Sequence, residues 1–105
     1  MVVEVRNYRT KPGAREEFLA VFAQRGVPAL RDSGISVLGP LRDLENPNRF
    51  SWLRAFPSLE DRERMRDAFY DSPVWKDELE SLLMPLLESY DFHLCEAAPG
   101  CVFDL

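Results

Sequence analysis

The order in which strands and helices follow one another constrains this chain more than any other feature of its sequence. Four segments have the patterns of strands, either many β-branched and aromatic residues or side chains that alternate with a period of two. They cover residues 2–10, 35–41, 49–56 and 87–97. One helical segment separates the first two strands, and two helical segments separate the last two. This order predicts an α+β fold of the ferredoxin-like, split βαβ type, in which helices cover one face of a four-stranded antiparallel sheet.

Glycine, proline and serine residues mark the expected helix boundaries. Gly26 and Pro28 interrupt the first helical segment, because proline lacks the backbone N–H that a helix interior uses. Gly34 is expected to end this segment in a left-handed conformation. Ser58 is expected to cap the second helix, and Ser72, which a proline follows, is expected to begin the third. The first helix is therefore expected to be kinked or split.

The length and charge of the chain exclude several classes of protein. Its 105 residues suffice for a single domain, which we place at residues 1–97, followed by a tail at residues 98–105. Eighteen acidic against thirteen basic side chains give a net charge of −5, which argues against a general nucleic-acid-binding protein. No apolar run approaches the roughly 20 residues that cross a bilayer, so no membrane association is expected.

The expected compartment is the cytoplasm, and no metal or other cofactor is expected. Glu4 and Arg6 lie where a secretory signal needs an apolar region. Cys95 and Cys101 have no metal-binding spacing, and we interpret them as reduced thiols. The single histidine, His93, argues against a histidine-rich metal site and against a Ser-His-Asp triad.

A sheet with helices on one face leaves its other face open, and this predicts a homodimer. Large side chains share one parity class on the third and fourth strands, and we assign them to the open face: Phe50, Trp52, Phe56, Tyr90 and Phe92. An exposed apolar surface of that size is rare on monomers. Packing against a second copy across a two-fold axis would bury it.

Charged and aromatic residues on two neighbouring strands form a candidate ligand site. Glu4, Arg6 and Tyr8 share one face of the first strand, and Trp52 and Arg54 alternate along the third, which this fold places beside the first. Arginine suits a carboxylate or enolate oxygen, and aromatic rings suit stacking, so the group fits a planar or anionic organic molecule. The alternative is that Glu4 pairs with Arg54, or with Arg6 of a second copy, and that the network only stabilises the structure.

Two other features have an ordinary structural interpretation. Arg62, Arg64 and Arg66 are interleaved with acidic residues, which predicts a helix face exposed to solvent. Trp75 falls in the apolar stripe of the third helix and is interpreted as an anchor of the core.

Three segments of the chain together resemble the NIPSNAP family of the dimeric α+β barrel superfamily. Residues 4–13, EVRNYRTKPG, are similar to the opening E-L-R-x-Y-x-x-K-P-G of that family. Residues 52–62 resemble its W-x-x-Y-x-S-L-x-x-R segment, with Phe56 where tyrosine is usual. Residues 71–75, DSPVW, followed by residues 85–87, PLL, resemble its D-P-x-W and P-L-L pair.

The resemblance implies that two sheets, one per subunit, close into a barrel with the helices outside. It does not specify a reaction, because the superfamily includes antibiotic-biosynthesis monooxygenases, haem-degrading oxygenases, isomerases and dehydratases. Its cofactor-free oxygenases place substrate in a cleft between sheet and helices, which adds Asn7 as a candidate beside Trp52 and Trp75. The haem-degrading relatives use a helix histidine, and residues 58–84 contain none, so haem degradation is not expected.

The sequence therefore predicts a homodimer that binds a small aromatic or anionic organic molecule between helices and sheet. The candidate ligand-binding residues are Arg6, Asn7, Tyr8, Trp52 and Arg54. Any catalysis is expected to be cofactor-independent, of the monooxygenase or isomerase type. The alternative is a non-catalytic homodimeric interaction or structural protein. An enclosed cavity of about 300 Å³ or more, lined by arginine with tyrosine or tryptophan, would favour ligand binding.

Overall fold

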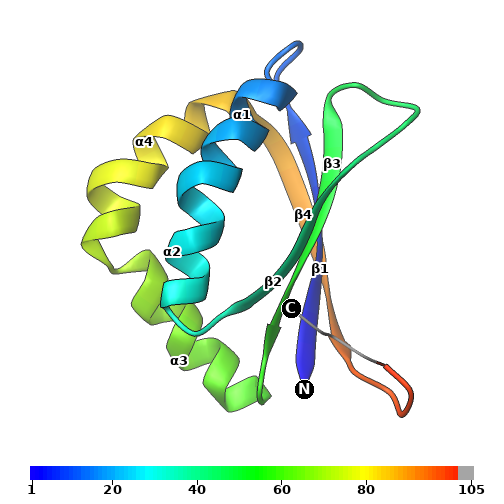
Figure 1. The fold of residues 1–105 in the computed structure, drawn as a ribbon, viewed down its shortest axis with the longest axis vertical. Coiled ribbons are helices and arrows are strands. Elements are labelled where there is room, and N and C mark those ends of the chain that lie inside the picture. Colours follow the sequence, from blue (N-terminus) through cyan, green and yellow to red (C-terminus); the bar gives the residue numbers. More distant parts are fainter. Residues whose placement is uncertain (102–105) are drawn as a thin grey trace.

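The four predicted strands form one antiparallel sheet with the order β2-β3-β1-β4. A computed structural model describes residues 1–101 of the chain. The strands are β1 (Val2–Thr10), β2 (Ser36–Arg42), β3 (Arg49–Phe56) and β4 (Leu87–Glu96). The element order and the single sheet confirm the α+β, ferredoxin-like prediction, with β1 and β3 in the centre (Figure 1).

The strand register brings distant parts of the sequence into contact on one face of the sheet. On β1, Glu4 lies opposite Arg54 of β3, and Arg6 lies opposite Trp52. Alternate side chains of a strand share a face, so these four side chains and Tyr8 lie on the same side. This is the face on which the candidate site develops.

The first helical segment is continuous but widens in its middle. It comprises α1 (Arg15–Val21), a π-helical turn η1 (Phe22–Gly26) and α2 (Val27–Asp32). The interruption predicted at Gly26 and Pro28 thus takes the form of a π-helical turn that ends at Gly26, two residues before the proline, and the helical direction continues. Gly34 has φ of +84°, which confirms the predicted left-handed end of the segment.

The second helical segment of the structure lies between β3 and β4 and contains both helices that were predicted there, separated by a turn at residues 71–72. Its parts are α3 (Leu59–Tyr70), a π-helical turn η2 (Val74–Leu79), α4 (Glu80–Leu83) and a 3₁₀ turn η3 (Met84–Leu86). The predicted serine caps are present. The backbone N–H of Asp61 donates to Ser58 Oγ at 3.1 Å, and that of Trp75 donates to Ser72 Oγ at 3.4 Å.

Both helical segments cover the same face of the sheet (Figure 1), and they cover the aromatic side chains of β3. Phe50, Trp52 and Phe56 are 1%, 3% and 1% exposed, so their assignment to the open face was wrong. The physical reason is that large rings contribute most when they are buried beneath the helices. Tyr90 and Phe92 lie on the same side but on the edge strand β4, and they stay 53% and 40% exposed.

The face that carries no helices is more polar than predicted. At its centre Asn7 accepts a hydrogen bond from Ser51 Oγ at 2.8 Å and donates one to Asp91 at 3.1 Å. The residue class used to predict a homodimer is therefore largely buried within one chain. Among the described residues, no helix has the length and apolar character needed to span a bilayer.

Candidate functional site

A buried carboxylate holds three arginines together beneath the helices. Glu4 is fully buried and accepts hydrogen bonds from Arg54 Nε at 3.0 Å, from Arg62 Nε at 2.8 Å and from Arg6 Nη1. Burial would raise the pKa of Glu4, but attraction by Arg54 and hydrogen bonds from Arg62 and Arg54 hold it below its ordinary value. The carboxylate is therefore ionised at neutral pH.

Arg62 was predicted on a solvent-exposed helix face, and this prediction was wrong. The side chain is 5% exposed and reaches Glu4 from α3. The alternation of charges along α3 gave no sign of this contact, because its partner lies 58 residues earlier in the chain. Arg64 is exposed as predicted and pairs with Asp61 at 2.9 Å.

The buried cluster carries more positive than negative charge. Arg6, Arg54 and Arg62 contribute three positive charges and Glu4 one negative charge, so the four groups carry +2. Aromatic rings stabilise part of this excess through cation–π contacts. The guanidinium carbon of Arg6 lies 4.8 Å from the Phe92 ring centre and 5.5 Å from that of Trp52. An unbalanced buried charge of this kind favours a site for an anion.

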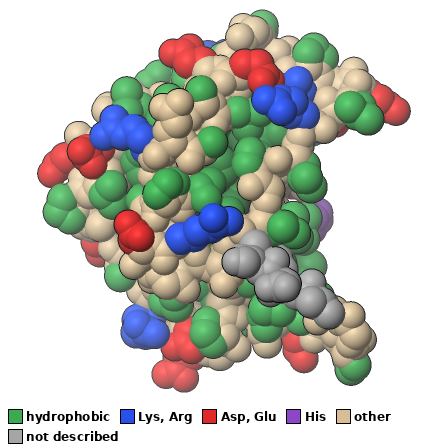
Figure 2. Space-filling view, in the orientation of Figure 1, with side chains coloured by type: hydrophobic (Ala, Val, Ile, Leu, Met, Phe, Trp, Pro, Cys, Tyr) green, Lys and Arg blue, Asp and Glu red, His purple; other side chains and the backbone are tan. Residues whose placement is uncertain are grey.

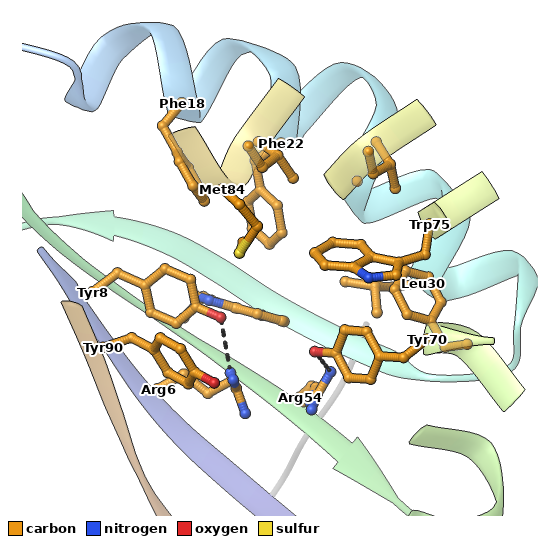
Figure 3. Close-up of a pocket in the computed structure, with 15 residues that line it drawn as sticks. Arg6, Tyr8, Phe18, Phe22, Leu30, Arg54, Tyr70, Trp75, Met84 and Tyr90 are labelled. Atoms are coloured by element: carbon orange, nitrogen blue, oxygen red, sulfur yellow. Dashed lines mark hydrogen bonds between the residues drawn. The ribbon is translucent and has the colours of Figure 1, made fainter. Parts of the chain in front are cut away.

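Two tyrosines connect the arginines to an apolar cavity. Arg6 Nε donates to the hydroxyl oxygen of Tyr8 at 3.2 Å, and Arg54 Nη1 donates to that of Tyr70 at 3.2 Å. Figure 3 shows both hydroxyls pointing into the space between the sheet and the helices. Burial raises the pKa of Tyr8, and this outweighs the opposing effect of Arg6, so Tyr8 keeps its proton at neutral pH.

The cavity lies between the helices and the sheet, where hydrophobic side chains gather in a hollow of the surface (Figure 2). The volume of the cavity is about 100 Å³. This is less than the 300 Å³ set from the sequence as the mark of a ligand site. Both helical segments and three strands contribute to the wall, which consists of Arg6, Tyr8, Phe18, Phe22, Gly26, Leu30, Trp52, Arg54, Phe69, Tyr70, Trp75, Leu79, Leu83, Met84 and Tyr90.

Both π-helical turns line this cavity. Phe22 and Gly26 come from η1, and Trp75 and Leu79 come from η2. π-helical turns are rare and occur often at functional sites, because they redirect side chains within an otherwise regular helix. The two π-helical turns therefore lie at the same cavity as the buried arginines Arg6 and Arg54.

The structure brings four of the five predicted site residues together. Arg6, Tyr8, Trp52 and Arg54 all line the cavity. Asn7 does not, because it follows Arg6 by one residue on a strand and so points to the opposite face. The predicted alternative, a pair between Glu4 and Arg54, is also present, so the network is both structural and adjacent to the cavity.

Several cavity residues were missed from the sequence or interpreted otherwise. Tyr70 ends α3, Trp75 lies in η2 and Tyr90 lies on β4, so each reaches the cavity from a different element. Trp75 was interpreted as a core anchor, and it does pack against Phe69 and Tyr70, yet it also lines the cavity. Only the tertiary arrangement of the helices shows this.

The cavity wall contains few kinds of polar side-chain group. Apart from two arginines, its polar groups are the hydroxyls of three tyrosines and the indole nitrogens of two tryptophans. Glu4 is engaged by three arginines and is not a free base. Within residues 1–101, no group of three histidine, cysteine or acidic side chains is placed to hold a metal ion. The wall is thus suited to donate hydrogen bonds to an anion and to stack on a flat body.

Comparison with solved structures places the chain among proteins of this fold. A NIPSNAP family protein of unknown function from Agrobacterium tumefaciens is 26% identical, with a TM-score of 0.86 over 99% of this chain and 94% of the other. An uncharacterised NIPSNAP domain protein from Burkholderia xenovorans is 23% identical, with a TM-score of 0.84 over 97% and 99%. A putative antibiotic biosynthesis monooxygenase from Chloroflexus aurantiacus is 17% identical, with a TM-score of 0.70 over 98% of each chain, which shows likeness of fold alone.

Comparison with curated protein sequences gave no match. The sequence profile of the NIPSNAP family, in contrast, matches residues 3–98, which is nearly the whole chain. This confirms the resemblance seen in the three sequence segments. The chain belongs to the NIPSNAP family.

Proposed function

We propose that the protein binds a small organic anion with a flat, apolar body in the cavity between helices and sheet. The observation that carries this proposal is the buried cluster with a net charge of +2 beside an apolar wall. An anion in the cavity would balance part of the charge that Glu4 leaves uncompensated. In surroundings of low dielectric constant, such compensation is stronger than at the protein surface.

The aromatic rings in the wall of the cavity support an aromatic or similarly flat ligand. Phe22 and Trp52 stand at 62° with ring centres 4.8 Å apart, and Tyr70 and Trp75 at 80° with ring centres 5.1 Å apart. Edge-to-face pairs of this kind offer both ring faces and ring edges to a ligand. The cavity is small, so the ligand is small, and its charge is expected to point towards β1 and β3.

Any turnover at this site is proposed to be cofactor-independent, of the monooxygenase or isomerase type. The cavity wall offers hydrogen-bond donors and positive charge, which stabilise an enolate or a similar anion formed from a substrate. The fold shared with putative antibiotic biosynthesis monooxygenases is compatible with this chemistry. A non-catalytic protein that uses the cluster only for stability is the alternative, and it would bind no anion in the cavity.

We propose further that the protein is a cytoplasmic homodimer. On one side, its edge strand β4 pairs with no other strand of residues 1–101, and three apolar side chains on it are 40% or more exposed: Tyr90, Phe92 and Leu94. Edge strands and exposed apolar patches are places where protein chains associate. A second copy would cover these side chains.

The test compares an aromatic anion with its neutral analogue. Titration calorimetry with benzoate and benzamide measures affinity for two molecules of nearly the same shape. Benzoate is expected to bind at least about tenfold more tightly, because a charge-assisted hydrogen bond contributes about 1.5–3 kcal/mol. Tyr8→Phe is expected to weaken benzoate binding, whereas Ser51→Ala, which removes a hydroxyl from the opposite face of the sheet, is expected to leave it unchanged.

Two results would contradict the proposal. Equal affinity for benzoate and benzamide would show that the excess positive charge has no part in recognition. Absence of binding by either molecule, in protein whose cooperative thermal unfolding shows that it is folded, would favour the purely structural role of the cluster.

A further inference from the structure

One buried hydrogen-bond donor in the cavity wall has no acceptor. The indole of Trp52 is 3% exposed and lines the cavity, and its Nε1–H has no hydrogen-bond partner among the described residues. No other buried side-chain nitrogen or oxygen in residues 1–101 lacks a partner. An indole nitrogen can only donate, and a buried donor without an acceptor is destabilising. The indole N–H of Trp52 therefore lacks the acceptor that a buried donor needs.

Two further donors face the same cavity. The hydroxyl oxygens of Tyr8 and Tyr70 accept from Arg6 and Arg54, so the hydrogen of each hydroxyl remains free to donate. Neither hydroxyl donates to another group among the described residues, and both point into the cavity (Figure 3). A phenol that accepts from a guanidinium is polarised, which makes it a stronger donor.

The arginines place these donors around Trp52. The guanidinium carbon of Arg54 lies 5.6 Å from the ring centres of both Trp52 and Tyr70. That of Arg6 lies 5.5 Å from the Trp52 ring and 5.6 Å from the Tyr8 ring. Each arginine thus lies over the Trp52 ring and donates to the hydroxyl of one tyrosine. The three donors come from β1, β3 and α3, and all three residues line the cavity.

We infer that the hydroxyls of Tyr8 and Tyr70 and the indole N–H of Trp52 together bind a single oxyanion, the phenolate or enolate oxygen of a one-ring aromatic ligand. This inference rests on the proposed function and names the chemical class of its ligand. Arg6 and Arg54 act as positioning residues: they orient and polarise the tyrosines and supply positive charge behind them. A phenolate oxygen accepts several hydrogen bonds at one atom, which matches donors that approach from three elements.

The size of the cavity limits the ligand to one ring. Cavities of about 150 Å³ hold benzene, and the volume here, about 100 Å³, is smaller, so the cavity admits at most one ring. The helical side of the wall contributes bulky side chains such as Phe18, Leu30 and Met84. A fused two-ring body would have to displace some of these side chains from a packed core.

The electrostatics of the wall favour the ionised form of such a ligand. The charged or titratable side chains that line the cavity are Arg6, Tyr8, Arg54, Tyr70 and Tyr90, with Glu4 and Arg62 behind them. The side chains contributed by α1, η1, α2, η2, α4 and η3 carry no charged or titratable group. No anion other than Glu4 opposes a bound phenolate among these described groups, and the proton that the phenol loses passes to bulk water.

The experiment uses 4-nitrophenol, whose anion absorbs visible light and whose neutral form does not. Absorbance titrations against pH, with and without saturating protein, measure the pKa of the bound and free phenol. The pKa of the bound phenol is expected to fall by about one unit or more, which corresponds to about 1.4 kcal/mol in favour of the anion.

Two variants test the donors. Trp52→Phe and Tyr70→Phe are each expected to lower the affinity for the anion by about tenfold and to raise the pKa of the bound phenol towards the free value. Tyr70→Phe keeps the ring and removes only the hydroxyl, so it stays informative if Trp52→Phe disturbs the core. Binding of 4-nitroanisole, which has no ionisable oxygen, is expected to be the same in wild type and Tyr70→Phe. Ser51→Ala again serves as the control variant, since its hydroxyl lies on the other face of β3.

The outcomes separate this inference from the proposed function. If benzoate binds but 4-nitrophenol does not, or if the pKa of bound 4-nitrophenol equals or exceeds the free value, the oxyanion site is refuted and the anion site stands. Unchanged affinity in both variants refutes the role of the three donors. Equally tight binding of 4-nitro-1-naphthol refutes the one-ring limit. If neither benzoate nor 4-nitrophenol binds, both proposals are refuted.

Discussion

Replacing Glu4 by glutamine removes the one negative charge that holds three buried arginines together. Glutamine keeps nearly the same shape, but its amide nitrogen cannot accept, so besides the charge the substitution removes one of the two oxygens that accept from Arg54 and Arg62. Arg54 and Arg62 lie 3.0 Å and 2.8 Å from the carboxylate and are 1% and 5% exposed. In Glu4→Gln, three positive charges stay buried with no buried counter-charge, since the other carboxylate near Arg62, that of Glu63 at 3.9 Å, is exposed. Breaking a buried ion pair in this way costs about 3–5 kcal/mol, and the variant is expected to lose that much of its free energy of unfolding.

Urea unfolding followed by circular dichroism measures this loss. Thermal unfolding gives a second measure. For a domain of this size, each kcal/mol of lost unfolding free energy lowers Tm by about 4 °C or more, so the Tm of Glu4→Gln is expected to lie at least about 12 °C below that of the wild type. The slope of the unfolding free energy against urea is expected to stay the same, because the substitution changes stability without changing the surface that unfolding exposes.

The dependence of stability on pH gives an independent measure. The pKa of Glu4 in the folded protein is lowered: burial alone would raise it, but Arg54 and Arg62 outweigh this effect. A lowered folded pKa means that the stabilisation is complete above the unfolded pKa of about 4.3 and is lost as pH falls through the folded value. The wild type should therefore lose stability in this acidic range, and Glu4→Gln should lack this part of the loss.

A matched control comes from the surface. Glu16 is exposed and pairs with Arg42 at 2.7 Å, so Glu16→Gln removes the same charge from a pair that solvent screens. This control is expected to unfold at nearly the same urea concentration as the wild type. If Glu4→Gln also unfolded at that concentration, the buried arginines would need no counter-charge, and the role assigned to Glu4 would be refuted.

Three further predictions concern backbone, cavity and assembly. Gly39 has φ of +106°, and a Cβ there would lie 3.1 Å from Cβ of Trp52, so Gly39→Ala is expected to lose more unfolding free energy than Gly13→Ala. Gly13 has φ of +76°, and a Cβ there would meet no atom within 4 Å, so equal losses in the two variants would show that the contact with Trp52 is unimportant. A Cβ at Gly26 would lie 2.7 Å from the Phe22 ring, which forces the ring to move, and Gly26→Ala is expected to change the affinity for benzoate measured by calorimetry. Light scattering of the eluted protein is expected to give twice the 12.1 kDa mass of one chain, and a mass of one chain at micromolar concentration would contradict the homodimer.

Local patterns in the sequence were sufficient to predict the elements and most of the candidate site. Alternation along β1 placed Arg6 and Tyr8 on one face, and the element order placed β3 beside β1, so the approach of Arg6 to Trp52 followed from sequence. The serine caps and the glycine at the end of α2 were likewise local signals, and the structure contains them. The three family motifs occur in order along the chain, and the family match confirmed them.

What sequence patterns left open were choices that depend on distant parts of the chain. Alternation states which side chains share a face, but the two faces of a sheet are equivalent until helices cover one of them. For this reason Phe50 and Trp52 were assigned to the open face. Asn7 was added through the family resemblance, and it lies on the face opposite Arg6 and Tyr8, as alternation along β1 indicates.

Arg62 shows the same limit on a helix. Its neighbours in sequence are charged and exposed, and only the approach of α3 to the buried Glu4 turns it inward. The sequence by itself thus determined the elements, their order and the set of residues on each strand face, because these depend on interactions between near neighbours. The tertiary structure decided which face is covered, which charges are buried and which donors meet in the cavity, because burial and electrostatic pairing depend on groups far apart in the chain.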